Sequence, residues 1–180
     1  MISMIDLQTL TISYGKKVLV DSVNAEFAPG TVYGLVAPNG HGKTTLLRAM
    51  AGLPGPRVDG SIVLDEVQGT GAREVRSMIF YAPGEGTLLY PGLRAEDHLK
   101  MVCDMWPHAC DIEEIVEQTQ IGEFAKMWIR TLSQGMKQQL TLAIAYATGA
   151  RYLLLDEPMN ALDPSRVDLH SEILRKLADS

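Results

Sequence analysis

The stretch Ala37–Thr45, which reads Ala-Pro-Asn-Gly-His-Gly-Lys-Thr-Thr, decides how this chain can fold. It follows the apolar run Val32–Val36, which predicts a buried parallel strand, and precedes Leu46–Ala51, which predicts the first turns of a helix. A strand, a glycine-rich turn ending in Gly-Lys-Thr and a helix form a phosphate-binding loop, whose backbone N–H groups hold phosphates at the helix N-terminus. An ordinary glycine turn is the alternative, but the spacing and context favour nucleotide binding.

The composition is that of one globular domain. The chain has 180 residues, of which 46% are hydrophobic and 21% charged, enough for a sizeable core. A net charge of −6 and the lack of a dense Lys/Arg stripe argue against nucleic-acid binding. Cys103 and Cys110 match no metal or disulfide pattern, so we expect reduced thiols in a cytosolic protein. No signal-peptide layout or membrane-spanning apolar run is present, so membrane attachment would need a partner.

The order of strand and helix patterns predicts the fold class. Alternating or continuous apolar residues predict strands at Ile5–Tyr14, Val18–Phe27, Ser61–Leu64, Ser77–Tyr81 and Tyr152–Leu155. From Leu93 to about Ala147 the apolar spacing is helical, and the expected helix N-caps are Asp111, Ser133 and Asp163. We therefore predict an α/β P-loop NTPase with a mostly parallel sheet, an N-terminal antiparallel β hairpin and a helical insert. Trp106 and Trp128 are expected to serve core or interface packing rather than ligand contact.

Two carboxylates, Asp156 and Glu157, come at the end of the predicted buried strand Tyr152–Leu155. Ligands of open α/β sheets gather at the carboxyl ends of strands. An Asp at this place can hold Mg²⁺ through water, and a Glu beside it can orient or deprotonate the attacking water. A solvated turn is the alternative, and the phosphate-binding loop makes the functional interpretation the stronger one.

Ser133 allows two interpretations. It has the chemistry of a helix N-cap, and a helix N-terminus carrying Ser and Gly is also a receptor for a terminal phosphate. Composition alone does not separate them.

The three stretches together resemble the ATPase subunit of an ATP-binding cassette (ABC) transporter over nearly the whole chain. Ala37–Thr45 resembles the Walker A loop, Leu153–Pro158 the Walker B strand, and Leu132–Met136 the signature sequence of this superfamily. Asn160–Asp163 is similar to the loop that contacts the partner subunit, and Tyr90–Leu93 is also typical of the family.

The resemblance implies a role for each matching residue. Nucleotide contacts fall on Tyr14 against adenine, on Asn39, Gly40, His41, Gly42, Lys43, Thr44 and Thr45 of the loop, and on Ser133 and Gly135 facing the ATP of a second subunit. Thr44 and Asp156 would hold Mg²⁺, and Glu157 would be the catalytic base. His41 is expected to point outward rather than to perform chemistry.

The resemblance also implies the organisation and the partners. Residues 1–180 form one ABC-type domain, with a nucleotide-binding core at about 1–83 and 148–180 and a helical subdomain at about 84–147. The subunit would bind ATP and Mg²⁺, pair with a second ABC ATPase subunit as a homo- or heterodimer, and power a membrane-spanning partner from the cytoplasmic face. The Ser-x-Gly-Met-Lys-Gln segment after Leu132 is similar to subunits of exporters.

The sequence departs from the family at several positions. Ala37 replaces the first loop glycine, which would cost on the order of 1 kcal/mol if that position needs a positive φ. Gln134 and Met136 replace usual signature residues. Gly84 stands where the family has a Gln that touches Mg²⁺ and water, and the adjacent Glu85 could only partly substitute for it.

A His that contacts the γ-phosphate follows a later strand in relatives, and the chain ends at Ser180 before such a residue. The four histidines, which are His41, His98, His108 and His170, all precede that strand. We therefore expect either a shortened chain or a subunit with weak hydrolysis. Two alternatives to a transporter ATPase stay open: a regulatory or degenerate nucleotide-binding subunit, and a soluble ABC-type ATPase not involved in transport.

Overall fold

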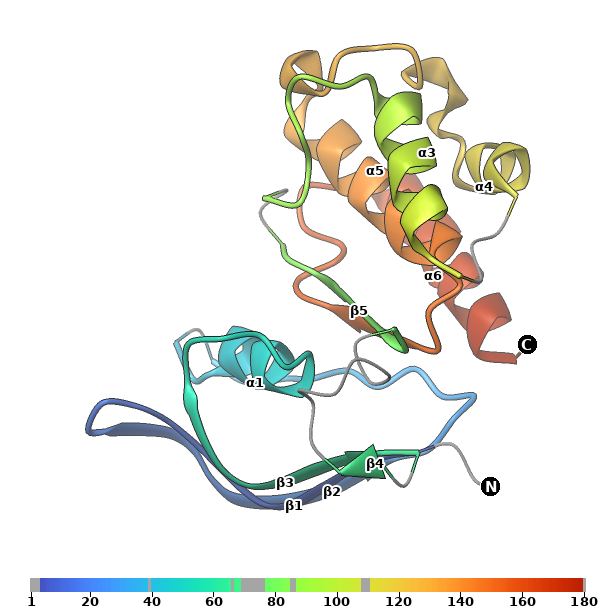
Figure 1. The fold of residues 1–180 in the computed structure, drawn as a ribbon. Coiled ribbons are helices and arrows are strands. Elements are labelled where there is room, and N and C mark those ends of the chain that lie inside the picture. The colour runs from blue at the N-terminus through green and yellow to red at the C-terminus, as the bar shows by residue number, and fades with distance from the viewer. Residues whose placement is uncertain are drawn as a thin grey trace. The chain divides into compact units, whose positions relative to one another are not determined.

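The computed structural model describes residues 4–38, 40–65, 67–68, 77–84, 87–107 and 111–179 (Figure 1). The chain forms two compact units. The first comprises Met1–Ile79 together with Leu174–Ser180, and the second comprises Phe80–Ile173.

The first unit contains a four-stranded antiparallel sheet with the order β2-β1-β3-β4. Its strands are β1 (Ile5–Tyr14), β2 (Lys17–Phe27), β3 (Arg57–Leu64) and β4 (Val67–Gln68). The predicted hairpin is confirmed, since Tyr14 pairs with Lys17 across a turn in which Gly15 has a φ of 55°. The side chains that β1 and β3 bury in the core include Leu7, Leu10, Ile12 and Leu64.

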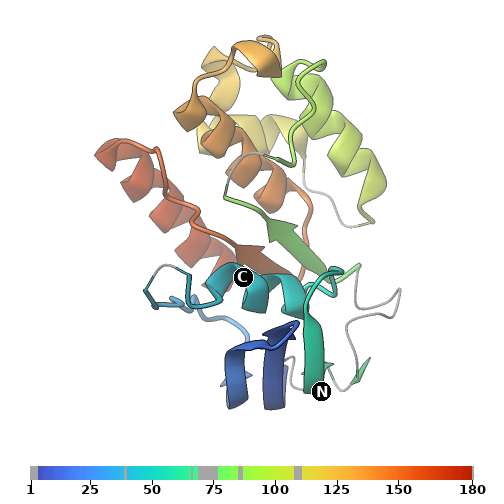
Figure 2. The ribbon, with the colours of Figure 1, turned by 90° about the vertical axis from the view of Figure 1, so that its left-hand side faces the viewer.

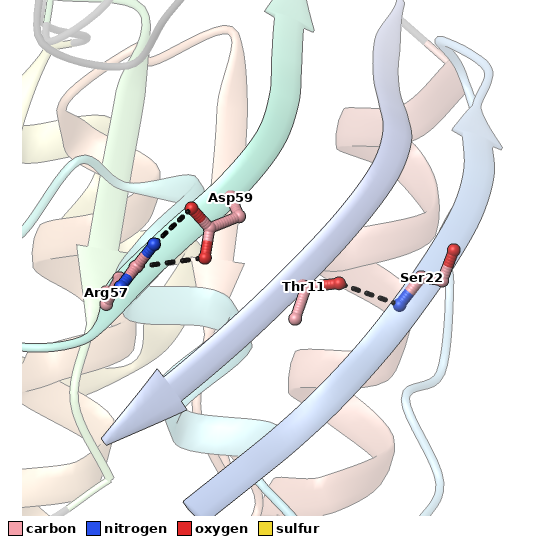
Figure 3. Close-up of polar contacts among 4 residues, drawn as sticks. All are labelled: Thr11, Ser22, Arg57 and Asp59. Carbon is pink, nitrogen blue, oxygen red and sulfur yellow. Dashed lines mark hydrogen bonds and ion pairs between the residues drawn. The ribbon is translucent and has the colours of Figure 1, made fainter. Parts of the chain in front are cut away.

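The sheet is irregular between its hydrogen-bonded stretches. Register shifts interrupt the β1–β2 ladder, and Ser22 has a φ of 49°, as in a bulge. Figure 3 shows the Ser22 N–H donating to Thr11 Oγ1 at 3.0 Å, so a side chain replaces a missing ladder bond. The figure also shows Arg57 Nε at 3.1 Å from Asp59 Oδ2 on β3. Both side chains are more than half exposed, so this ion pair adds little stability.

The predicted strand Val32–Val36 is wrong. Among the described residues, 32–36 belong to neither sheet, and the Val36 side chain is 93% exposed. An apolar run signals that a segment can be buried, but it does not provide the neighbouring strand that must accept its backbone hydrogen bonds. The helix after the loop is confirmed: α1 runs Lys43–Met50, and Ala51 is its C-cap.

The second unit is mainly helical (Figure 2). Its strands β5 (Ile79–Ala82) and β6 (Tyr152–Leu155) form a two-stranded parallel sheet and confirm two predicted strands. Its helices are α3 (Ala95–Met105), α4 (Ile112–Thr119), α5 (Gln134–Ala147) and α6 (Pro164–Asp179), with short 3₁₀ turns η1 (Ile121–Glu123) and η2 (Ile129–Thr131). The last residues of α6 count with the first unit.

Helix α5 is the centre of the second unit. It packs against α3 and α4, and all its residues from Gln138 to Ala147 are buried. A helix that is buried on nearly all sides carries the core of its unit.

The three predicted N-caps are confirmed on the helices that surround or form this core. Asp111 Oδ1 accepts from the Glu113 N–H at 2.8 Å, Ser133 Oγ from Met136 at 3.2 Å, and Asp163 Oδ1 from Arg166 at 3.1 Å.

Candidate functional site

The phosphate-binding loop lies in the first unit and leads directly into α1. Gly40 and Gly42 have φ values of 78° and 87°, and Gly42 is the N-cap residue of the helix. Besides the positive φ, a side chain at Gly42 would meet a steric obstacle, because its Cβ would lie 3.2 Å from Leu19 Cβ. Both glycines thus allow a turn that L-residues with side chains rarely adopt. Asn39 lies outside the described residues.

Lys43 is the first residue of α1, where the unpaired N–H groups of a helix attract anions. Its Nζ donates to the Ala37 carbonyl at 2.7 Å, so the amine reaches back along the loop. The next two residues differ in exposure: Thr44 is exposed and Thr45 is half-buried, as is Lys43. The helix start therefore brings one cation and one exposed hydroxyl to the same turn.

Ala37 carries no left-handed strain. It is absent from the non-glycine residues with positive φ, although it replaces the usual first glycine. The conditional penalty that the sequence suggested therefore does not arise. His41, also within the loop, is exposed.

Tyr14 ends β1 in the same unit, and its side chain is 44% exposed. A Cβ atom at Gly55 would come within 2.8 Å of the Tyr14 hydroxyl oxygen, so the glycine leaves room for this side chain. A partly exposed aromatic ring is suited to stacking on a base.

Asp156 and Glu157 lie in the second unit, immediately after β6, and have different surroundings. Asp156 is 7% exposed, its backbone N–H donates to the Ala82 carbonyl of β5 at 2.9 Å, and its Oδ2 accepts from the Tyr81 hydroxyl at 3.3 Å. Glu157 is exposed and has a φ of 48°. One carboxylate is therefore fixed and largely dry, and the other is presented to solvent.

The backbone at Glu157 is strained, because a positive φ is unfavourable for a residue with a long side chain. Asn160 stabilises this turn: its Nδ2 donates to Glu157 Oε2 at 2.6 Å, and its backbone N–H donates to the Glu157 carbonyl at 3.1 Å. These contacts of Asn160 and Tyr81 with the two carboxylates were not predicted. Tyr81 ends a predicted strand, which is a signal that could have indicated it, whereas Asn160 comes five residues after Leu155.

Ser133 and Gly135 begin α5 in the second unit. The N-cap hydrogen bond of Ser133 is present, and a Cβ at Gly135 would lie 2.8 Å from the Ala161 carbonyl oxygen. Gln138, which is 3% exposed, donates from Nε2 to the Pro158 carbonyl at 2.8 Å. The start of α5 is therefore packed on the segment that follows the two carboxylates. Gln138 was not predicted, because it lies on the side of α5 opposite to the apolar positions Leu140 and Ala147, and no local pattern indicates that this side is buried too.

Comparison with known proteins identifies the family. The sequence pattern of the ABC transporter family matches residues 20–160. The chain belongs to the ABC transporter family. A lantibiotic transport ATP-binding protein of Streptococcus pyogenes is 34% identical over 95% of this chain and 73% of its own length. A manganese transport system ATP-binding protein of Listeria innocua is 32% identical over 97% and 75%. A Nod factor export ATP-binding protein of Sinorhizobium fredii is 34% identical over 96% and 52%.

Solved structures agree with the fold. A putative ABC transporter ATP-binding protein from Pyrococcus furiosus matches with a TM-score of 0.84 and 26% identity, covering 98% of this chain and 86% of that one. The ATP-binding cassette MJ0796, solved as a dimer bound to ADP and Pi, matches in fold with a TM-score of 0.84 at 23% identity, covering 97% and 83%. This ABC ATPase is therefore an α/β P-loop protein and an ATP-binding subunit of the transporter family.

Two further observations concern the membrane and the metal. No helix in the described part of this ABC ATPase is long and apolar enough to cross a bilayer. Among the described residues, no group of three or more His, Cys, Asp or Glu side chains could hold a metal ion. Mg²⁺ differs from most protein-bound metals in needing only one or two carboxylates when phosphate oxygens complete its shell. Thr44 in the first unit has a hydroxyl oxygen and Asp156 in the second unit has a carboxylate, and hard oxygens of this kind are the ligands that Mg²⁺ prefers.

Proposed function

We propose that this subunit binds MgATP, pairs with a second ABC ATPase subunit, and hydrolyses ATP to power a membrane-spanning exporter from the cytoplasmic face. The observation that carries the proposal is the start of α1, where positive-φ glycines, Lys43 and an exposed Thr44 hydroxyl meet at one helix N-terminus. Family membership supplies the transport context.

In this proposal the first unit provides most of the nucleotide contacts. Lys43 would neutralise the β- and γ-phosphates, and the N–H groups around Gly40 and Gly42 would hold their oxygens. Tyr14 would stack on adenine. Asn39, His41 and Thr45 would complete the loop around the phosphates.

Thr44 and Asp156 would hold Mg²⁺, which when bound neutralises charge on the transferred phosphoryl group. Glu157, exposed at its strained turn, would accept a proton from the attacking water. Ser133 and Gly135 would face the ATP of the second subunit from the N-terminus of α5. The helical segment of about 84–147 would act as the subdomain that contacts the membrane-spanning partner.

The test is steady-state phosphate release from MgATP at increasing protein concentration, with Glu157→Gln beside the unaltered chain. Turnover that rises more steeply than protein concentration and disappears in Glu157→Gln supports a dimeric ATPase. Linear turnover that survives in Glu157→Gln contradicts it.

The direction of transport needs its own test. A relative named for Nod factor export supports the exporter proposal, while relatives named for manganese transport and sulfonate import show that the family covers other tasks. Deletion of the gene from its host should sensitise cells to an externally added peptide antibiotic if the system exports. A growth defect confined to low manganese or to sulfonate as the sulfur source would instead indicate import.

A second candidate is a nucleotide-binding subunit with little turnover. Gly84 favours it, because no side chain is present where the family carries a Gln beside Mg²⁺ and water. In that case the subunit would bind ATP as tightly as a hydrolysing subunit does, and phosphate release would stay at background at every protein concentration.

A further inference from the structure

The sheet of the second unit places Asp156 beside the end of β5. Strands β5 and β6 are neighbours in this sheet, and Asp156 is the first residue after β6. Its backbone N–H donates to the Ala82 carbonyl of β5 at 2.9 Å. This hydrogen bond fixes the backbone of Asp156, but it does not fix the direction of the carboxylate, because the side chain can still rotate about its own torsions.

The Tyr81 side chain of β5 contacts that carboxylate. Successive side chains of a strand lie on opposite faces of the sheet. Phe80 packs on Trp106, with ring centres 5.8 Å apart, so Tyr81 lies on the other face of β5. The Tyr81 hydroxyl donates to Asp156 Oδ2 at 3.3 Å. The neighbouring strand therefore supplies the contact that orients the carboxylate.

Asp156 needs such a contact because it is largely buried. Only 7% of the residue is exposed, and burial of a carboxylate is costly unless the carboxylate accepts hydrogen bonds. Among the described residues, Tyr81 is the one that donates a hydrogen bond to this carboxylate, and Oδ1 accepts none. The protein thus holds one carboxylate oxygen, and the other keeps its lone pairs for water or a cation.

The residue at position 84 does not take over this contact. A Cβ atom at Gly84 would lie 2.8 Å from the Asp156 carbonyl oxygen, so the chain passes directly over the Asp156 backbone there. The side chain of the Gln that the ABC family has at this position is missing. In the described part of the segment 77–84, the side chain that reaches the Asp156 carboxylate is that of Tyr81.

We infer that Tyr81 is a positioning residue for Mg²⁺, because its hydroxyl holds the Asp156 carboxylate in one orientation for the ion. Asp156 binds Mg²⁺ in the proposed function, on which this inference rests. Groups that hydrogen-bond to a metal ligand orient it, and their loss typically costs about 10- to 100-fold in metal affinity or activity. The distance of 3.3 Å exceeds the roughly 2.8 Å of a strong O–H···O bond, so we expect an effect at the lower end of this range.

The experiment measures how strongly Mg²⁺ tightens nucleotide binding. The full chain is titrated with a fluorescent ATP analogue in EDTA and again in excess Mg²⁺, and the ratio of the two affinities is the Mg²⁺ effect. Tyr81→Phe removes only the hydroxyl. We expect this variant to keep the affinity in EDTA and to lose about tenfold of the Mg²⁺ effect. The Mg²⁺ concentration for half-maximal phosphate release should rise by a similar factor, whereas turnover at saturating Mg²⁺ should change little.

Two further variants separate positioning from stability. Tyr146→Phe is the matched control, because it removes another hydroxyl of the same unit, one that is fully buried and lies 3.2 Å from His170 Nδ1. It should lower the urea midpoint without changing the Mg²⁺ effect. Asp156→Asn should remove the Mg²⁺ effect, and adding Tyr81→Phe to it should cause no further loss, because Tyr81 acts on the ion only through this carboxylate.

An equal loss of affinity in EDTA and in Mg²⁺, or an unchanged Mg²⁺ effect in Tyr81→Phe, would overturn the inference. A Tyr81→Phe chain that does not fold would assign the hydroxyl to stability and would also overturn it. The proposed function fails separately: a chain that does not bind the analogue, or that keeps its Mg²⁺ effect in Asp156→Asn, contradicts that function. A chain that loses the Mg²⁺ effect in Asp156→Asn but keeps it in Tyr81→Phe contradicts only the role of Tyr81.

Discussion

The backbone of Gly84 lies so close to the carbonyl of Asp156 that a Cβ atom at residue 84 would approach its oxygen to 2.8 Å. The same atom would lie 3.4 Å from Glu157 Cβ. The segment after β5 is therefore packed directly on the two carboxylate residues after β6. In this conformation the Gln that the ABC family carries at this position would have no space. Gly84 therefore lacks the side chain of that Gln and also allows a close backbone contact that the Gln would prevent. Glu85, the suggested substitute, lies outside the described residues.

Gly84→Ala should destabilise the second unit by about 1–3 kcal/mol, because the added Cβ must displace backbone rather than a flexible side-chain end. Denaturant unfolding measures the change. Gly92→Ala is the matched control, since a Cβ there meets nothing within 4 Å and residue 92 has no positive φ. Equal stability of the two variants would show that Gly84 has more room than its position indicates.

Lys43→Ala should weaken ATP binding by about tenfold or more, because the phosphates lose a charge-assisted hydrogen bond at the N-terminus of α1. Titration with a fluorescent ATP analogue measures the affinity. Lys16→Ala, an exposed cation on the β1–β2 hairpin, should leave the affinity unchanged. An unaltered affinity in Lys43→Ala would contradict the assignment of the phosphate-binding loop.

Glu157→Gln should abolish phosphate release while leaving ATP affinity intact, because the neutral amide does not accept the proton of the attacking water. It should also favour an ATP-held dimer, since bound ATP then persists and stabilises the associated state. Size-exclusion chromatography with and without ATP measures the dimer. The substitution Glu117→Gln, on the exposed side of α4, is the control. A Glu157→Gln chain that stays monomeric at saturating ATP would contradict a site shared between subunits.

Local patterns predicted most of the secondary structure. The alternation in Ile5–Tyr14 and Val18–Phe27 specified the hairpin, and Asp111, Ser133 and Asp163 marked helix starts because short polar side chains satisfy free N–H groups there. The family resemblance is confirmed as well. It could be predicted because several motifs occur in one order along the chain.

Features that depend on non-local contacts were not predictable. The failure at Val32–Val36 arose because hydrophobicity does not identify a pairing strand. The packing of Gly84 on Asp156 joins residues far apart in sequence, and no local pattern encodes it. Trp128 was expected in core or interface packing, and its 40% exposure between two arginines depends on how residues 91–96 meet residues 125–130.

The stability of the protein should fall between pH 7 and pH 5 because of His170, which is fully buried on α6. Its Nδ1 lies 3.2 Å from the Tyr146 hydroxyl oxygen, and burial, with a smaller effect of Arg166, lowers the pKa of His170 from 6.5 to about 4. In the unfolded chain His170 therefore binds a proton near pH 6.5, whereas in the folded chain it does so only near pH 4. The contribution of neutral His170 to the free energy of unfolding is fully present above pH 6.5. It declines as the pH falls from 6.5 toward 4, by at most about 1.4 kcal/mol per pH unit for one group.

His170→Gln keeps a polar partner for Tyr146 and removes the titration, so its urea midpoint should change less between pH 7 and pH 5. Burial also lowers the pKa of His98, so a smaller slope should remain in the variant. An identical slope in both proteins would show that His170 is not the group responsible.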